Sequence, residues 1–209
     1  MKTLLITFGI LCSISGFSQS FGNKIDPANG FSEKLKTAGE KTQSITCNFN
    51  QTKHLAVLTK ANVSTGKFFF KKEQNICLEY TIPTGNLIVM SGGKFKIVAD
   101  GKTNVVDMRS NPMMRQMGAM LTACMTGDIQ LFGSDSNTEY FETSTTYTVV
   151  ISPNNRRVKK YLKQIVLTFD KQDMTLNSMQ MKENDTDFTQ YQFSDKKLNS
   201  SFGDDKFKI

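Results

Sequence analysis

The fold is indicated most clearly by residues 64–82, STGKFFFKKEQNICLEYTI. Successive side chains of a β-strand point to opposite faces, so Phe68, Phe70 and Lys72 share one face, and Phe69 lies on the other face between two lysines. We expect the lysine-bearing face to be solvated, because lysine is seldom buried. Phe68 and Phe70 then point inward, and Lys72 stands at the inner rim.

The next run of residues repeats this pattern, because Ile76, Leu78 and Tyr80 alternate with Cys77 and Glu79. The turn between the two runs is short, so the strands must be antiparallel. A sheet with one apolar face needs a cover on that face.

Alternation with period two continues through most of the chain and predicts a mostly β protein with one long antiparallel sheet. We expect strands near residues 45–54, 63–72, 75–82, 86–91, 94–99, 103–108, 138–143, 146–152, 163–170, 174–183 and 187–193. One helix precedes this series of strands and a second helix interrupts it. The first is expected over 27–43, where Asp26 can cap the helix and Pro27 is tolerated in its first turn. The second begins near Pro112 and ends at Gly127, a typical helix-ending residue.

The second helix carries methionines at three- and four-residue steps, which places them on one face. Methionine is unbranched and adapts to irregular partners. We therefore expect this helix to cover the apolar face of the sheet, either as an ordinary core element or as an adaptable surface for a hydrophobic cargo. The residues concerned are Met113, Met117, Met120 and Leu121.

The first residues of the chain are typical of a cleaved secretory signal peptide. Residues 1–18 contain one early cation, a short apolar run and small residues before an expected cleavage after Ser18. The apolar run is far shorter than the roughly 20 residues that cross a bilayer. We expect export to the periplasm, a linker over 19–26 and one soluble domain over 27–209.

The composition argues against nucleic acid binding and against common classes of enzyme. The formal net charge is +7, but the lysines are scattered and flank apolar strands, as solvated residues do. The one histidine, His54, lies in a polar strand context, and motifs for nucleophilic catalysis or phosphate binding are absent from the sequence. We expect no catalytic activity, no metal and no cofactor.

Three cysteines follow residue 18, namely Cys47, Cys77 and Cys124. An odd number of cysteines in an oxidising compartment leaves at least one thiol unpaired. We interpret most of them as small buried apolar residues. Whether Cys47 and Cys77 form a disulfide is left open by the sequence.

Several weak motifs follow one another in a characteristic order. They are CNFNQ at 47–51, a small-Gly-aromatic strand at 64–72, an aromatic-x-x-Pro strand end at 80–83, a Gly-Lys hairpin at 91–95, and residues 151–153, 167–170 and 207. This order resembles the periplasmic outer-membrane lipoprotein carrier family, LolA. The resemblance covers nearly the whole chain after the expected signal peptide.

The resemblance implies an incomplete antiparallel β-barrel whose concave apolar face is closed by a helical lid. It also implies a carrier that receives lipoprotein acyl chains from an inner-membrane release complex and passes them to an outer-membrane acceptor. We expect this carrier to be a monomer. The residues expected to line the apolar cavity are Phe68, Phe70, Ile76, Leu78, Tyr80, Met113, Met117, Met120 and Leu121.

The sequence departs from the family pattern where the lid would be latched. In the family, an arginine after the turn lysine holds the lid helices closed and a proline follows it. The matching residues here are Lys72 and Glu73. Lysine presents a point charge instead of a planar fork, so a latch by Lys72 is expected to be weaker or differently built.

Two other functions fit the same features. The fold could carry another lipid or a hydrophobic biosynthetic intermediate, and mass spectrometry of bound lipids would distinguish this from lipoprotein carriage. The chain could also be a non-catalytic periplasmic interaction domain in which the methionine-rich helix is ordinary core.

Overall fold

The computed structural model describes residues 21–26, 30–110, 112–128 and 136–209; for residues 112–117 and 120 it describes the backbone and not the side chains. The strands are β1 Asn23–Ile25, β2 Ser44–His54, β3 Asn62–Lys71, β4 Asn75–Ile82, β5 Leu87–Ser91, β6 Lys94–Ala99, β7 Lys102–Asp107, β8 Ser136–Glu142, β9 Thr146–Pro153, β10 Gln164–Asp170, β11 Leu176–Lys182 and β12 Phe188–Leu198. They form one antiparallel sheet of 12 strands in the order β1-β8-β9-β10-β11-β12-β2-β3-β4-β5-β6-β7.

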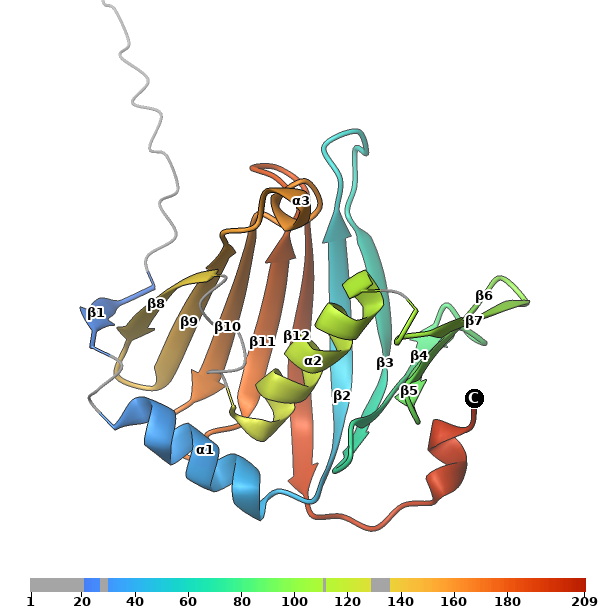
Figure 1. Ribbon diagram of the computed structural model, residues 1–209, viewed down its shortest axis with the longest axis horizontal. Coiled ribbons are helices and arrows are strands. Elements are labelled where there is room, and N and C mark those ends of the chain that lie inside the picture. The colour runs from blue at the N-terminus through green and yellow to red at the C-terminus, as the bar shows by residue number, and fades with distance from the viewer. Residues whose placement is uncertain (1–20, 27–29, 111, 129–135) are drawn as a thin grey trace, which may run out of the picture.

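The sheet is curved but not closed into a barrel, and two helices lie across its concave face (Figure 1). These helices are α1, Phe31–Lys41, and α2, Pro112–Thr126. A short helix α3, Arg156–Lys159, joins β9 to β10, and a 3₁₀ helix η2, Asp204–Phe207, lies near the end of the chain. The expected fold class, an incomplete antiparallel barrel with a helical cover, is confirmed.

The expected strands all form, with shifts of a few residues at their ends, but two segments differ from the sequence analysis. Residues 23–25, placed in a linker, form β1 and pair with β8, where Ile25 lies opposite Tyr140. Strand β12 continues past residue 193 to Leu198, through an irregularity of register after Ser194. A bulge of this kind adds residues to one strand without ending the pairing. It also interrupts the two-residue alternation, so the alternation predicts a strand that ends too early.

The two cover helices were predicted with unequal accuracy. Helix α1 begins at Phe31, preceded by Gly30 in the left-handed conformation (φ 77°), so the expected start at residue 27 with Asp26 as cap is wrong. Residues 27–29 lie outside the described part of the chain. Helix α2 ends at Thr126, and Gly127 adopts φ 70°, which confirms the glycine stop.

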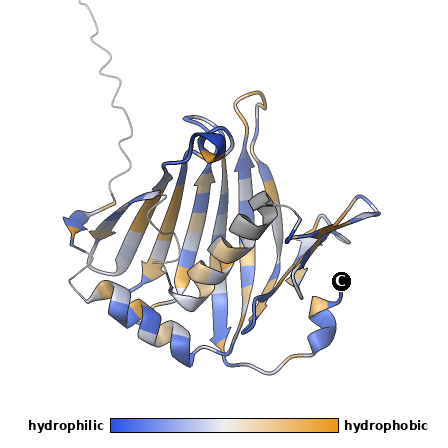
Figure 2. Ribbon diagram, viewed as in Figure 1, coloured by the Kyte–Doolittle hydropathy of each residue, from blue (hydrophilic) through white to orange (hydrophobic). Residues whose placement is uncertain are grey.

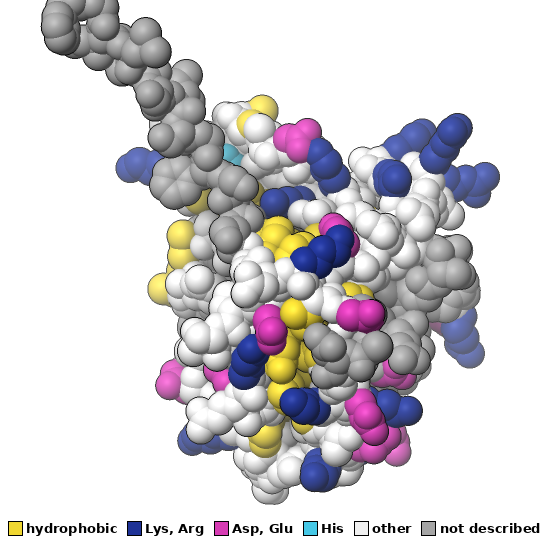
Figure 3. Space-filling view, turned by 90° about the vertical axis from the view of Figure 1, so that its left-hand side faces the viewer, with side chains coloured by type: hydrophobic (Ala, Val, Ile, Leu, Met, Phe, Trp, Pro, Cys, Tyr) yellow, Lys and Arg dark blue, Asp and Glu magenta, His cyan; other side chains and the backbone are white. Residues whose placement is uncertain are grey.

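The main core lies between the concave face and the cover. Phe68, Phe70, Ile76 and Leu78 are at most 7% exposed there. Apolar residues of α1 and α2 turn toward the sheet, whereas α3 is almost entirely hydrophilic (Figure 2). Seen from the side on which β1 ends the sheet, apolar side chains form a stripe flanked by charged groups (Figure 3).

The convex face carries a second, smaller apolar cluster that the sequence analysis did not anticipate. Phe69 was expected on a solvated face but is only 8% exposed. The segment after β12 folds back over it, so that the Phe202 ring lies 5.4 Å from the Phe69 ring. Two ion pairs hold this segment, Lys206 with Glu79 at 2.8 Å and Lys71 with Asp204 at 2.5 Å. Lys71, one of the two lysines that flank Phe69, therefore serves as an attachment point for this segment, and the expectation of a bare solvated face is wrong.

Removing residues 201–209 is expected to uncover this convex cluster. Burial raises the pKa of the Cys77 thiol to about 12, so the thiol is protonated and unreactive at pH 8. After truncation the pKa should fall toward its usual value and iodoacetamide should label Cys77. The loss of Phe202 and Phe207 should also lower the free energy of unfolding by about 2–4 kcal/mol. Labelling of Cys47, on the concave face, should not change; equal labelling of both thiols would contradict this assignment.

Candidate functional site

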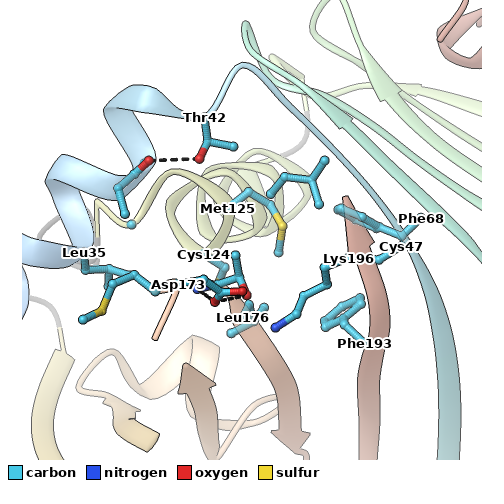
Figure 4. A pocket seen from close by; sticks show the side chains of 16 residues that line it. Leu35, Thr42, Cys47, Phe68, Cys124, Met125, Asp173, Leu176, Phe193 and Lys196 are labelled. Atoms are coloured by element: carbon cyan, nitrogen blue, oxygen red, sulfur yellow. Dashed lines mark hydrogen bonds between the residues drawn. The ribbon is translucent and has the colours of Figure 1, made fainter. Parts of the chain in front are cut away.

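A narrow pocket lies where the two cover helices meet the concave face (Figure 4). Its apolar lining comes from both layers: Leu35, Ile45, Phe68, Met125, Leu176 and Phe193. Asp173 and Lys196 add charged groups to the lining. The cavity is small, about 30 Å³, which is room for one or two water molecules. A longer apolar ligand could enter this space only if the cover moved.

An aromatic band extends from this pocket along the concave face. Phe68 and Phe193 have ring centroids 5.5 Å apart, Tyr191 stacks on Phe193 at 6.4 Å, and Phe49 lies 6.0 Å from Tyr191. The Tyr80 ring closes the band at 5.1 Å from Phe49. Aromatic rings supply much apolar area with few rotatable bonds, so the band offers a rigid apolar floor.

The structure places the sequence-predicted cavity residues in three groups. Phe68 lines the pocket. Phe70, Ile76, Leu78 and Leu121 belong to the same apolar core, and Tyr80 lies at the far end of the band, where its hydroxyl donates to Gln51 Oε1 at 2.8 Å. The positions Met113, Met117 and Met120 lie on α2, but their side chains are outside the described part of the structure.

Residues from the end of the chain complete the site and were missed. Tyr191 and Phe193 reach it because β12 pairs with β2. Lys196 reaches it because the backbone is irregular after Ser194, with Asp195 at φ 54°. The Lys196 ammonium donates to Asn177 Oδ1. The alternation of residues 190–194 places Tyr191 and Phe193 on one face of a strand, but it does not show that this strand pairs with β2 or that Lys196 turns inward.

Lys72 contacts the cover directly. Its Nζ donates to the carbonyl oxygen of Glu40 at 2.6 Å, and its backbone N–H donates to the carbonyl oxygen of Gln43 at 2.9 Å. Carbonyl groups in the last turn of a helix lack helical partners, and a cation there also interacts favourably with the helix dipole. Lys72 thus joins the end of β3 to the last turn of α1.

Replacing Lys72 by methionine is expected to weaken the attachment of α1 by about 1 kcal/mol. Uptake of a fluorescent fatty acid should then be about fivefold faster, because the cover opens more often. Stopped-flow fluorescence measures this rate. Lys71→Met is the matched control, since it removes a neighbouring lysine that binds Asp204 on the convex face. Equal acceleration in both variants would show that Lys72 has no special role.

The two cover helices touch backbone to backbone. A Cβ at Gly39 of α1 would lie 1.6 Å from the Thr126 carbonyl oxygen, and one at Gly127 would lie 2.4 Å from the Leu35 carbonyl oxygen. Glycine at both positions therefore lets the helices approach more closely than any other residue would allow. Any movement of one cover helix away from the other would therefore have to break this close contact.

The cysteines lie on opposite sides of the sheet. Cys47 and Cys124 line the pocket, whereas Cys77 belongs to the convex cluster, and all three thiols are free. A Cys47–Cys77 disulfide is therefore excluded in this fold. Burial raises the pKa of Cys47 and of Cys124 to about 12, so these thiols report on whether the pocket is open.

The remaining candidate groups do not converge on the pocket. His54 is the last residue of β2 and stacks on Phe188 at 5.3 Å. Within the described ranges, no group of three or more His, Cys, Asp or Glu side chains could hold a metal ion. Among these same residues, no helix has the length and apolar character needed to span a membrane.

The protein has an open antiparallel sheet whose apolar concave face is covered by two crossing helices. This arrangement places it in the class of half-barrels with a helical cover. The chain belongs to the family described as outer membrane lipoprotein carrier protein LolA, which matches residues 40–209. No curated protein sequence matches the chain.

The chain is similar to several solved structures at low sequence identity. An uncharacterized conserved protein from Thermus thermophilus has a TM-score of 0.52 at 6% identity, over 88% of this chain and 94% of that chain. A LolA superfamily protein from Nitrosomonas europaea has a TM-score of 0.44 at 12% identity, over 88% and 99%. Lipoprotein LppX from Mycobacterium tuberculosis has a TM-score of 0.47 at 11% identity, over 86% and 99%.

Proposed function

We propose that this protein is a periplasmic carrier that binds lipoprotein acyl chains between its helical cover and its concave face. It would receive them from an inner-membrane release complex and hand them to an outer-membrane acceptor. Family membership over residues 40–209 supports this proposal. Its periplasmic location rests on the expected signal peptide at 1–18, which lies outside the described residues.

The observation that carries the proposal is the apolar pocket between two separable layers. The sheet is held by twelve paired strands, whereas the cover contacts it through side chains and through the Lys72 hydrogen bond, and the two cover helices meet each other at Gly39. Since the closed cavity of about 30 Å³ cannot hold an acyl chain, binding requires the cover to move away from the floor. The sheet keeps its backbone hydrogen bonds while this happens, so opening need not unfold the domain.

In the open state the apolar face of the sheet would contact the chains. The aromatic band and the predicted residues Phe70, Ile76 and Leu78 form its floor, and Leu121 with the methionine positions 113, 117 and 120 forms its moving side. Methionine suits a surface that must repack around chains of different shape. No chemical step is required, so the role is binding and release without catalysis.

The proposal is tested by identifying what copurifies with the protein from its native host. Intact mass spectrometry should find acylated lipoprotein in the preparation, and the Phe68→Glu variant should lose it, because a carboxylate in the pocket opposes apolar chains. If the preparation contains free lipid and no lipoprotein, the cargo of the pocket is a lipid. Repeated isolation without any acyl ligand, with circular dichroism showing a folded protein, would contradict carriage.

A further inference from the structure

One end of the molecule combines exposed apolar side chains with cations that form no ion pair with any residue the structure describes. The β2–β3 loop, residues 55–61, projects beyond the sheet at the end where α3 also lies (Figure 1). Its tip is apolar (Figure 2), with Val57 89% exposed and Leu58 39% exposed. Beyond α3, Tyr161 is 68% exposed. Three large exposed side chains at one end are characteristic of a contact surface.

The strand register and two polar contacts place these segments together. Phe188 pairs with both His54 and Lys182, so β2 ends beside the start of β12 and the end of β11. In the β11–β12 turn, Asp187 accepts a hydrogen bond from the Ala56 N–H at 2.7 Å, and Asp185 pairs with Lys163 after α3. The turn therefore links the loop to the α3 segment.

The cations at this end outnumber the free acids. Those with exposed side chains are Lys60, Arg156, Arg157, Lys159 and Lys160. Within the described part of the chain, none of these five forms an ion pair. Asp185 forms an ion pair with Lys163, whereas Asp187 accepts a hydrogen bond from an uncharged backbone group, so Asp187 and Glu183 are the remaining acids of the neighbouring turn. The surface is therefore positively charged around an apolar tip.

We propose that this end, the loop 55–61 together with the α3 segment 156–161, docks reversibly on an anionic phospholipid surface. Val57 and Leu58 would enter the headgroup region, Tyr161 would lie at the interface, and the five cations would contact lipid phosphates. Tyrosine favours membrane interfaces, and basic residues are attracted to anionic leaflets. An acidic protein would satisfy the cations, but a protruding aliphatic tip fits a penetrable lipid layer better. Few residues insert, so binding stays reversible.

Vesicle flotation tests the proposal with protein purified in the form that accumulates in its host. The protein should float with vesicles that contain phosphatidylglycerol, and much less with pure phosphatidylcholine vesicles. Added salt should weaken the binding, because exposed charges are screened. The variant Arg156→Glu/Arg157→Glu should bind anionic vesicles at least tenfold less, and so should Val57→Asp/Leu58→Asp, which removes the apolar tip.

The matched control is Lys34→Glu/Lys36→Glu, which makes the same change in net charge on exposed positions of α1, at the opposite end of the molecule (Figure 1). It should bind anionic vesicles within about twofold of the unmodified protein. An equal loss of vesicle binding in the control would overturn the proposal. A lack of preference of the unmodified protein for anionic vesicles would also overturn it, and would leave an acidic protein as the partner of this surface. Acyl binding, measured without vesicles, tests the carrier function separately.

Discussion

Alanine at Gly39 is expected to force the two cover helices apart. The added Cβ would lie 1.6 Å from the Thr126 carbonyl oxygen, and backbone atoms cannot move aside unless the helix moves with them. Overpacking of this kind lowers the free energy of unfolding by roughly 1–3 kcal/mol. Since the strain falls on the cover, the open state should be favoured and fatty-acid uptake should be about tenfold faster. Chemical denaturation and stopped-flow fluorescence measure the two effects.

Gly118→Ala is the control for this change. Its Cβ would meet the sulfur atoms of Met90 at 2.7 Å and Met108 at 3.1 Å. These belong to flexible side chains that can rotate away, so both stability and uptake should change much less. A Gly39→Ala protein with unchanged stability and uptake would show that the cover is not held at this crossing.

Alanine at Phe31 is expected to detach α1 from the sheet. The Phe31 side chain is 1% exposed, and its ring lies 4.4 Å from Tyr147 and 6.1 Å from Phe169. Removing a buried phenylalanine costs about 3–5 kcal/mol, and here the loss should fall mainly on α1. Amide exchange should accelerate over 31–41 and stay slow in β2 and β3. If the variant instead unfolds globally, with amide exchange accelerated equally in helix and sheet, α1 would be an ordinary part of the core. That result would support the alternative of a non-catalytic interaction domain.

Thiol labelling gives a second measure of the same change. In the Phe31→Ala variant the pKa of Cys124, raised to about 12 by burial, should fall toward its usual value. Iodoacetamide at pH 8 should then label Cys124 and spare Cys77 on the convex face. Phe69→Ala should give the reverse, because it loosens the convex cluster. Identical labelling patterns in the two variants would contradict the two-sided arrangement of the cores.

The sheet and the position of the cover could be predicted from the sequence because they depend on local signals. Residues 64–82 alternate cleanly, and the turns around them are short, so Phe68, Phe70, Ile76 and Leu78 were placed on the inner face. Gly127 ended α2 as expected. Strand alternation and a helix-ending glycine are properties of a few consecutive residues, so they can be recognised in the sequence without knowing which other segments lie nearby.

The rest of the site depends on contacts between distant parts of the chain. Tyr191 and Phe193 enter the pocket region only because β12 pairs with β2, more than a hundred residues earlier. Phe69 has the local pattern of an exposed position, and its burial comes from a segment over a hundred residues later. Lys196 is directed inward by the irregularity after Ser194, which the alternation of a single strand does not reveal. Single-strand periodicity carries no information on such pairings.

In the proposed carrier, acyl chains lie between the cover and the concave face. Photo-crosslinking with a triacylated peptide that carries a diazirine in one acyl chain would locate them. After irradiation, peptide mass spectrometry should find the label on β3 around Phe68, on β12 around Phe193 and on α2 around Met125. Label concentrated on the convex cluster around Phe69 and Phe202, or no label on a protein that remains folded, would contradict this location of the chains.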